Sequence, residues 1–214
     1  MTQTVDLAGL AALLAAEQGA ARRLVAVAGP PGSGKSTFTE QLHAALAGRV
    51  AVEVLPMDGY HYDDIVLNAR GHRARKGAPH TFDVDGFAAM LARLRADDGR
   101  DVAVPVFDRS IEIARAGARI IPAAVRLVLV EGNYLLLDDP AWSQLGPLFD
   151  RTVFLRVPED ELARRLTARW QGYGMDEETV RAKAEGNDLP NARQVNAQSV
   201  PADYEVANVA APTT

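Results

Sequence analysis

Residues 29–36 read Gly-Pro-Pro-Gly-Ser-Gly-Lys-Ser and match the phosphate-loop pattern G-x-x-x-x-G-K-[S/T]. An apolar strand is predicted just before them, over residues 24–28, and a helix after them to about Leu46. Glycines let the backbone curl until successive N–H groups point at anionic oxygens, and the helix N-terminus adds a positive field. Because strand, loop and helix follow in this order, the pattern favours a nucleotide-phosphate site over a glycine-rich turn that binds nothing.

The loop residues are expected to hold ATP together with Mg²⁺. We expect Lys35 to be exposed, to reach the β- and γ-phosphates and to avoid the core, while Ser36 offers its hydroxyl to Mg²⁺. Pro30 and Pro31 have no N–H, so the backbone donors should come from residues 32–36. The predicted nucleotide-binding residues are Gly29, Gly32, Ser33, Gly34, Lys35, Ser36 and Thr37.

The rest of the chain predicts a single α/β domain over residues 1–214. Apolar strands alternate with helices, which is typical of a parallel sheet covered on both faces. Residues 57–84 look like an irregular insertion rich in polar groups, and residues 111–121 could form a hairpin. The predicted strands after the loop are 50–55, 102–107, 127–130, 152–157 and 204–207, and helices are expected at about 5–18, over 87–94, after Pro158 and from about Glu177.

The composition disfavours several classes of function. The chain is 48% hydrophobic and 24% charged, with a formal net charge of -5, so it can form a core and lacks the basic balance of a nucleic-acid binder. It has no Cys, which excludes disulfides and thiolate metal sites. The apolar run near the N-terminus follows Asp6 without a preceding Lys or Arg, and it is too short for a bilayer. We therefore expect no membrane insertion, no nucleic-acid partner and a cytoplasmic location.

A carboxylate follows the second predicted strand, at Asp58. The C-terminal ends of parallel strands face the ligand crevice, so Asp58 should lie beside the phosphates and could accept the proton of an attacking hydroxyl. An Asp before Gly59 is equally common as a turn or capping residue, and position alone leaves both interpretations open. Neither Lys76 nor Lys183 lies in an N-K-x-D or T-K-x-D element, so a guanine-reading switch is not expected.

The segment that follows Asp58 resembles the one after the second strand in type I pantothenate kinases, which belong with uridine kinases and phosphoribulokinases. The resemblance extends from about Leu24 to Val206 and implies a P-loop, three-layer α/β/α fold with a mainly parallel five-strand core. Chains with the stretch 187–191 are similar to nucleoside/nucleotide kinases and fructose-transport-system kinases. The matching pieces are Asp58-Gly59-Tyr60, Val66-Leu67, Arg70-Gly71, Arg75-Lys76-Gly77, Pro79 and Thr81-Phe82-Asp83.

The resemblance also implies roles for residues outside the loop. Glu131, which follows the apolar run 127–130, resembles the acidic element that helps to hold Mg²⁺, through water; it could instead only cap the strand end. Arg165 and Arg169 resemble the arginines of a mobile lid, here about residues 160–175, that stabilise the transferring charge. They share one helix face, and the alternative is a solvated face paired with Glu161.

Several polar residues are candidates for contact with the phosphate acceptor. His61 and Tyr62 could touch it or be structural. Asp108 and Arg109 match the position where relatives place acceptor-contacting residues, and they could equally form a strand-end turn. Carboxylates such as Asp58 and Asp108 would suit the hydroxyls of a sugar.

A second group of candidates lies at the end of the 57–84 segment. Arg75 and Lys76 could hold an anionic group of the acceptor, or they could pair with Asp83 and brace the segment. Asp83 is also a candidate for contact with acceptor hydroxyls. Asn187 and Asn191, in contrast, are expected to be helix caps or turn formers.

Together these features predict an ATP-dependent kinase that transfers the γ-phosphoryl to a hydroxyl of a small metabolite. A sugar such as fructose, or a nucleoside, is favoured, because the chain lacks matches to the groups that surround pantothenate. Pantothenate kinase is the alternative within enzymes, and an ATP-binding regulatory subunit linked to sugar transport is the alternative outside them. The expected partner is the small-molecule acceptor; a homodimer is compatible with the sequence, which does not give the oligomeric state.

Overall fold

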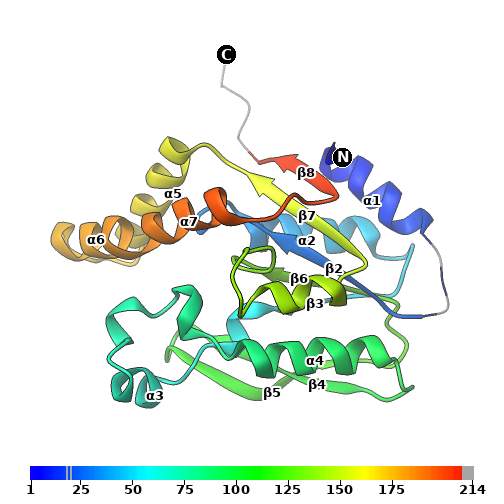
Figure 1. The fold of residues 1–214 in the computed structure, drawn as a ribbon. Helices are drawn as coiled ribbons and strands as arrows, with labels where there is room; N and C mark the ends of the chain where they lie inside the picture. The colour runs from blue at the N-terminus through cyan, green and yellow to red at the C-terminus, as the bar shows by residue number, and fades with distance from the viewer. Residues whose placement is uncertain (18, 20, 209–214) are drawn as a thin grey trace.

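The computed structural model describes residues 1–17, 19 and 21–208, and its centre is a parallel six-stranded sheet (Figure 1). All five strand pairs in this sheet are parallel, which confirms the predicted α/β fold. The sheet has one strand more than expected because Gln3–Thr4 adds to its edge. In spatial order the strands are β1 (Gln3–Thr4), β8 (Tyr204–Ala207), β7 (Arg151–Arg156), β2 (Arg23–Ala28), β6 (Leu127–Gly132) and β3 (Val52–Pro56).

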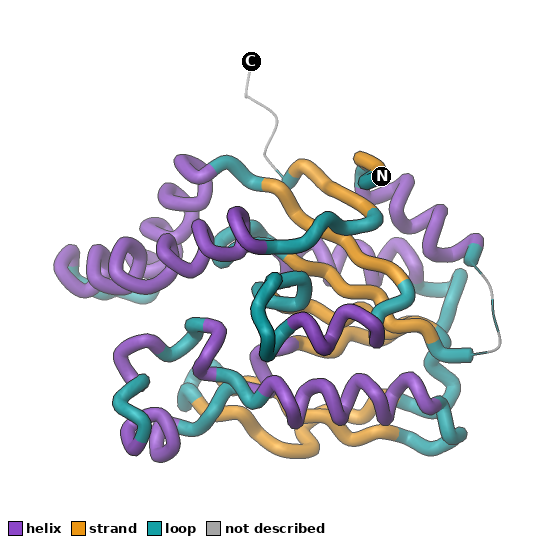
Figure 2. Tube along the Cα trace, viewed as in Figure 1, coloured by secondary structure: helices purple, strands orange, loops and turns teal. Residues whose placement is uncertain are grey.

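Helices cover both faces of the sheet, as the tube in Figure 2 shows. Successive side chains of a strand point to opposite faces, so Val25 and Val27 pack with α1 and α2 while Leu24 and Ala26 pack with α4. Burial on both sides explains the unbroken apolar sequence of β2. The helices are α1 (Leu7–Ala16), α2 (Lys35–Leu46), α3 (Asp64–Ala69), α4 (Val84–Ala96), α5 (Glu159–Gly172), α6 (Glu177–Lys183) and α7 (Leu189–Gln198).

A separate antiparallel ribbon is formed by β4 (Val102–Asp108) and β5 (Ile113–Ile121). The predicted strand at 102–107 is confirmed, but it pairs outside the parallel sheet. The hairpin expected within 111–121 is wrong, because residues 113–121 form a single strand that pairs with β4. The ribbon lies close to the 3₁₀ turn Met57–Tyr60 that follows β3. It therefore brings its turn toward the carboxyl end of the parallel strands.

The segment 57–84 is more regular than its sequence suggested. It contains α3, because Asp63 caps this helix by accepting a hydrogen bond from the backbone N–H of Ile65 at 2.8 Å. Short 3₁₀ turns occupy Met57–Tyr60, Arg73–Arg75 and Pro79–Thr81. The expectation of an irregular segment was thus wrong for residues 64–69.

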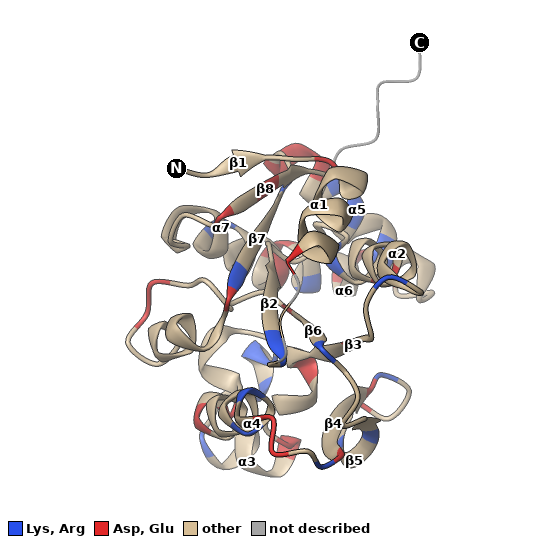
Figure 3. Ribbon diagram, turned by 90° about the vertical axis from the view of Figure 1, so that its right-hand side faces the viewer, with Lys and Arg blue, Asp and Glu red and all other residues tan. Residues whose placement is uncertain are grey.

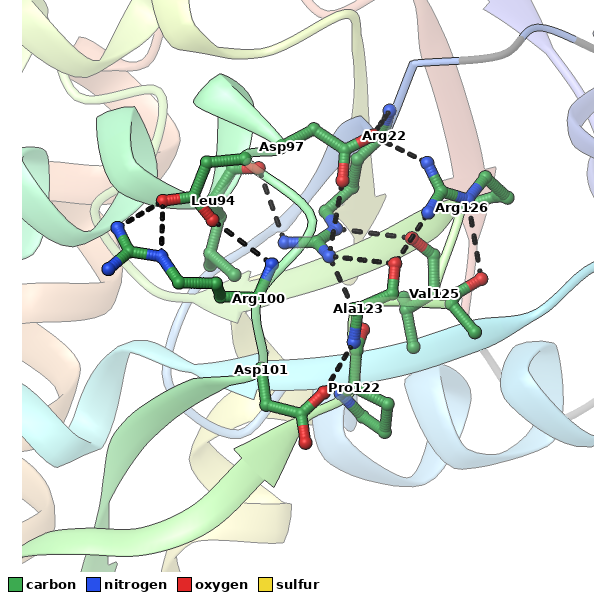
Figure 4. A network of polar contacts seen from close by, with 11 residues as sticks. Arg22, Leu94, Asp97, Arg100, Asp101, Pro122, Ala123, Val125 and Arg126 are labelled. Atoms are coloured by element: carbon green, nitrogen blue, oxygen red, sulfur yellow. Dashed lines mark hydrogen bonds and ion pairs between the residues drawn. The ribbon is translucent and has the colours of Figure 1, made fainter.

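A buried arginine organises the end of the sheet opposite the glycine-rich loop (Figure 4). Arg22 is 3% exposed, and its guanidinium donates to the carbonyls of Leu94 and Val125 and pairs with Asp97. A buried charge is tolerated when it is paired and hydrogen-bonded in this way. In the view of Figure 3, basic and acidic residues are interspersed along the whole chain rather than gathered in one region. Among the described residues, no helix is long and apolar enough to cross a bilayer.

Candidate active site

The loop between β2 and α2 has the backbone shape that its glycines permit. Gly32 and Gly34 both adopt φ of 81°, a conformation that side chains other than Gly rarely take, and Gly34 caps α2. A Cβ on Gly32 would also lie 2.9 Å from Leu166 of α5. The glycines therefore serve both the curl of the loop and the close approach of α5.

The backbone donors of this loop are fewer than the sequence suggested. The N–H of Ser33 donates to the carbonyl of Pro30 at 3.1 Å, and Ser33 is fully buried, so this amide is used inside the loop. The N–H groups of Lys35, Ser36 and Thr37 open α2 and have no carbonyl one turn earlier in the helix. These helix-opening groups, with the field of α2, form a cradle that fits an anion.

Lys35 is buried, whereas its sequence position suggested an exposed side chain. It is 6% exposed, and its ammonium donates to the carbonyl of Pro30 at 3.0 Å and to Ser33 Oγ at 3.5 Å. Burial lowers the pKa of Lys35 to about 8, while Glu131 and Asp58 act to raise it. The curled loop itself causes this burial, because it supplies the oxygens that hold the ammonium at the base of the cleft.

Ser36 and Glu131 form the part of the site that fits Mg²⁺. Ser36 Oγ donates to Glu131 Oε2 at 3.4 Å, which brings the loop and the end of β6 together. Burial raises the pKa of Glu131, and Lys35 acts against that rise. A hydroxyl and a carboxylate are the oxygen ligands that Mg²⁺ prefers. Within the described part of the chain no cluster of three His, Cys, Asp or Glu residues could hold a metal without further ligands.

Asp58 lies in the cleft, just past β3, with a cation against it. Arg109, at the tip of the β4–β5 ribbon, donates to Asp58 Oδ2 at 2.5 Å. Asp58 lines the same cleft as Lys35, Ser36 and Glu131, and it acts electrostatically on Lys35 and Glu131. Its location at the carboxyl end of a parallel strand is the place where such sheets present reacting groups.

An aromatic wall adjoins Asp58. The ring of His61 lies between Phe82 and Phe107, at centroid distances of 4.1 and 4.7 Å. Its Nδ1 is 2.8 Å from the carbonyl oxygen of Asp58, and burial lowers the pKa of His61. A neutral imidazole held between rings offers a flat, mostly apolar surface with one remaining polar edge.

The two arginines of α5 differ in their partners. Arg165 pairs with Glu161 at 2.6 Å and donates to the carbonyls of Asn208 and Ser33, so the alternative pairing with Glu161 is present. Arg169 lies 5.2 Å from the ring centre of Trp170, in a cation–π arrangement. Both line the cleft, and Arg169 acts electrostatically on Lys35.

A cleft of about 670 Å³ joins the loop, the 57–84 segment, the ribbon tip and the α5–α6 region. In Figure 1 these elements lie on one side of the molecule, with α3 on one flank and α5 and α6 on the other. The cleft collects most of the residues that the sequence singled out. Its lining includes Gly32, Gly34, Lys35, Ser36, Thr37, Asp58, His61, Lys76, Glu131, Arg165 and Arg169.

The remaining candidates lie outside this lining. Gly29 and Ser33 belong to the loop but do not line the cleft. Arg70 lies over the ring of Tyr62, with 4.5 Å between its guanidinium carbon and the ring centre. Asp83 caps α4 by accepting from the N–H of Gly86, and Asp108 accepts from Ser110 and pairs with Arg115. Asp83 therefore caps a helix, and Asp108 stabilises the turn at the end of β4.

Arg75 and Lys76 do not pair with Asp83 as one alternative proposed. Arg75 donates to the carbonyl of Gly186 at 2.8 Å and to Asn191 Oδ1 at 3.0 Å, more than a hundred residues away. Lys76 pairs with Asp64 at 2.7 Å and donates to the carbonyl of Glu112. Both cations therefore brace the 57–84 segment, but through these partners rather than through Asp83.

Sequence reasoning missed several groups that line the cleft. Arg109 was matched, with Asp108, to an acceptor-contacting position, but its pairing with Asp58 was not expected, because it needs the ribbon to pack against the turn after β3. Asn187 was expected to be a cap or turn former, yet it lines the cleft and donates to the carbonyl of Lys76. Further lining residues without an assigned role are Arg73, Phe107, Glu112, Asn133, Trp170, Lys183 and Asp188.

Comparisons with known proteins agree with this geometry. The family model described as an AAA domain matches residues 25–185. The chain is 37% identical over 177 residues to the uncharacterized protein YggC of Escherichia coli, covering 81% of this chain and 73% of that protein. It is 33% identical over 191 residues to a "Putative uridine kinase" of Schizosaccharomyces pombe. The match covers 85% of this chain and 81% of that protein.

A solved structure is similar over nearly the whole chain. The crystal structure of a "putative fructose transport system kinase" from Silicibacter sp. TM1040 has a TM-score of 0.89 and 41% sequence identity, covering 94% of this chain and 98% of that one. The family model spans more than half of the chain, and the similar structure covers 94% of it. The chain therefore belongs to the AAA domain family and is a P-loop kinase relative of the uridine kinase group.

Proposed function

We propose that this protein is an ATP-dependent kinase that transfers the γ-phosphoryl of ATP to a hydroxyl of a small metabolite, favouring a sugar or a nucleoside. The observation that carries the proposal is the placement of Asp58 in one cleft with the phosphate cradle. A hydrolase or sensor would need the cradle but no carboxylate beside an aromatic acceptor wall. The names of the relatives, a uridine kinase and a fructose transport system kinase, support the same reaction class.

The loop and the lid would hold the triphosphate and the charge that develops on it. The helix-opening N–H groups bind phosphate oxygens, and Lys35 moves from its partners Pro30 and Ser33 to the β- and γ-phosphates. Ser36 and Glu131 are the residues that would hold Mg²⁺, which supplies neutralisation of phosphate charge when bound. Arg169, which lines the cleft from α5, would close over the transferring group.

Asp58 would act on the acceptor. Its Oδ2 is occupied by Arg109, so within the described chain Oδ1 is the oxygen left to orient the hydroxyl and take its proton. Arg109 fixes the carboxylate in one orientation while this happens. His61 and Phe107 would bound the acceptor on the apolar side.

The engaged cations weigh against pantothenate as the acceptor. Arg75 was a candidate for binding the pantothenate carboxylate, but its guanidinium donates to Gly186 and Asn191. Lys76 is neutralised by Asp64. We propose that the reaction takes place in the cytoplasm, where ATP is available, and that a homodimer, if formed, is not needed to complete the cleft.

The experiment that tests the proposal measures ADP formation with a panel of metabolites, for the wild type and for Lys35→Ala. We expect ADP that depends on an added acceptor, and its loss in the folded variant. Arg100→Ala is a suitable control, since Arg100 is exposed and pairs only locally with Asp98. ADP formation that no acceptor stimulates would favour the ATP-binding regulatory subunit.

A further inference from the structure

The stretch 187–191 contributes to the cleft in a way that the proposed reaction has not used. Residues Ala184–Asp188 form a π-helical turn between α6 and α7, and such turns often occur at functional sites. The wider turn places Asn187 and Asp188 together at the cleft lining. Asn187 donates to the carbonyl of Lys76 at 3.0 Å and so joins this turn to the acceptor segment.

Asp188 is held in place through one of its two carboxylate oxygens. Trp170 donates from Nε1 to Asp188 Oδ2 at 2.8 Å. Among the described residues, Oδ1 of Asp188 has no hydrogen-bond partner, and the residue is only partly exposed. A carboxylate that is fixed on one side and open on the other can accept a hydrogen bond from a ligand.

Asp188 lines the cleft beside Asn187, which is bonded to the 57–84 segment. Tyr134 donates to the carbonyl of Gly77 at 2.6 Å; burial raises its pKa, and the carboxylates of Asp188 and Asp58 raise it further. Arg109, which contacts Asp58, also acts on Asp188. Asp58 and Asp188 both line the same cleft.

The cations near this region are already engaged. Asp64 pairs with both Arg73 and Lys76, at 2.6 and 2.7 Å. Arg109 is paired with Asp58. An acceptor with a carboxylate or phosphate near Asp188 would have to displace one of these pairs and approach a second carboxylate, which is electrostatically unfavourable.

Two further cations near Asp188 contact the aromatic ring that holds its carboxylate. Lys183 and Arg169 lie over the ring of Trp170, at 4.7 and 5.2 Å. Both cations also act electrostatically on Asp188, so they partly balance its charge while they contact the Trp170 ring.

We propose that Asp188 is a specificity-determining residue, which accepts a hydrogen bond from a second hydroxyl of an uncharged, polyhydroxylated acceptor while Asp58 takes the reacting hydroxyl. This inference rests on the proposed kinase function and narrows it to neutral polyols, meaning free sugars, sugar alcohols or nucleosides. A hydroxyl bonded to a carboxylate forms a charge-assisted hydrogen bond. Loss of such a bond should lower kcat/KM for the acceptor by roughly 10- to 100-fold.

The direct test is Asp188→Asn. Asn can still accept from Trp170, so the fold and the lid contact are kept, but the open carboxylate oxygen is lost. We expect a higher KM for the acceptor, an unchanged KM for ATP and an unchanged melting temperature. Asp160→Asn is the matched control, because Asp160 is exposed on α5 outside the cleft lining.

A second variant tests the same contact without changing Asp188, in case Asp188→Asn does not fold. Trp170→Phe keeps an aromatic ring but removes the N–H that fixes Asp188, so the KM for the acceptor should rise by a smaller factor. If both variants bind the acceptor as the wild type does, Asp188 has no part in recognition. A parallel loss of ATP affinity and melting temperature would make Asp188 a structural anchor of the lid instead.

The substrate class is tested with matched pairs that differ in one charged group: panthenol and pantothenate, glycerol and glycerate, fructose and fructose 6-phosphate. We expect ATP consumption with neutral members of the panel and little with their charged counterparts. Preference for the charged members would overturn this inference while leaving the kinase function intact. Consumption with neither class would contradict the proposed function itself, and the inference with it.

Discussion

Replacing Lys35 with Met should change how the stability of the protein depends on pH. The ammonium of Lys35 is buried in the folded protein, which lowers its pKa from 10.5 to about 8, whereas the unfolded chain has the ordinary value. Between these two values the unfolded state binds more protons, so the free energy of unfolding rises with pH. Folded Lys35 thus carries an unfavourable charge at neutral pH that disappears as the pH rises through 8.

The size of the effect follows from the two pKa values. Between pH 7 and pH 10 the wild type should gain about 2.5 kcal/mol relative to Lys35→Met, which has no such group. Urea denaturation of both proteins at the two pH values gives this difference directly, and other titrating groups cancel in the comparison. Parallel pH profiles for the wild type and Lys35→Met would refute the burial of this charge.

Three further variants test the roles assigned in the cleft. Asp58→Asn removes the proton acceptor and should slow turnover by roughly 10²–10⁴-fold at unchanged ATP affinity; lost ATP binding with a normal rate at saturation would make Asp58 a nucleotide or metal ligand. Arg169→Ala should lower kcat by up to roughly 10³–10⁵-fold, more than it raises the KM for ATP, and an effect confined to KM would limit Arg169 to ground-state binding. Glu131→Gln should raise the Mg²⁺ concentration needed for half-maximal rate, and an unchanged Mg²⁺ titration would contradict its assignment.

The parts of the fold that were predictable depend on residues close in sequence. The phosphate loop is eight consecutive residues, and the glycines adopt their conformations because of local sterics. The strands of the parallel sheet are apolar runs, since both faces are buried. The edge strand Gln3–Thr4 has no such signal, because two exposed polar residues become a strand only through pairing with β8.

The parts of the site that were not predictable depend on contacts between distant segments. Arg75 binds groups at 186 and 191, and no local pattern indicates those partners. The pairing of Arg109 with Asp58 requires the ribbon to pack against the turn after β3. The burial of Lys35 arises from how the loop folds back on Pro30, a property of three-dimensional shape rather than of residue type.

Asp83 and Asp108 illustrate the limit of arguing from residue type. A carboxylate near a strand end suits a substrate hydroxyl, but it suits a helix cap or a tight turn equally well. Asp83 accepts from an N–H at the start of α4, and Asp108 accepts from the N–H of Ser110. In both cases a backbone N–H two or three residues away donates to the carboxylate, so the side chain serves local structure instead of the cleft.

The most direct test of the central claim follows the γ-phosphoryl group itself. The protein is incubated with Mg²⁺ and ATP labelled in the γ-phosphate, together with fructose, ribose, uridine and pantothenate at equal concentrations, and the labelled products are separated. The account predicts label on a sugar or on uridine, and none on either with Lys35→Ala. Label found mainly on pantothenate would overturn the assigned substrate class, and label found only as inorganic phosphate would contradict the transfer reaction.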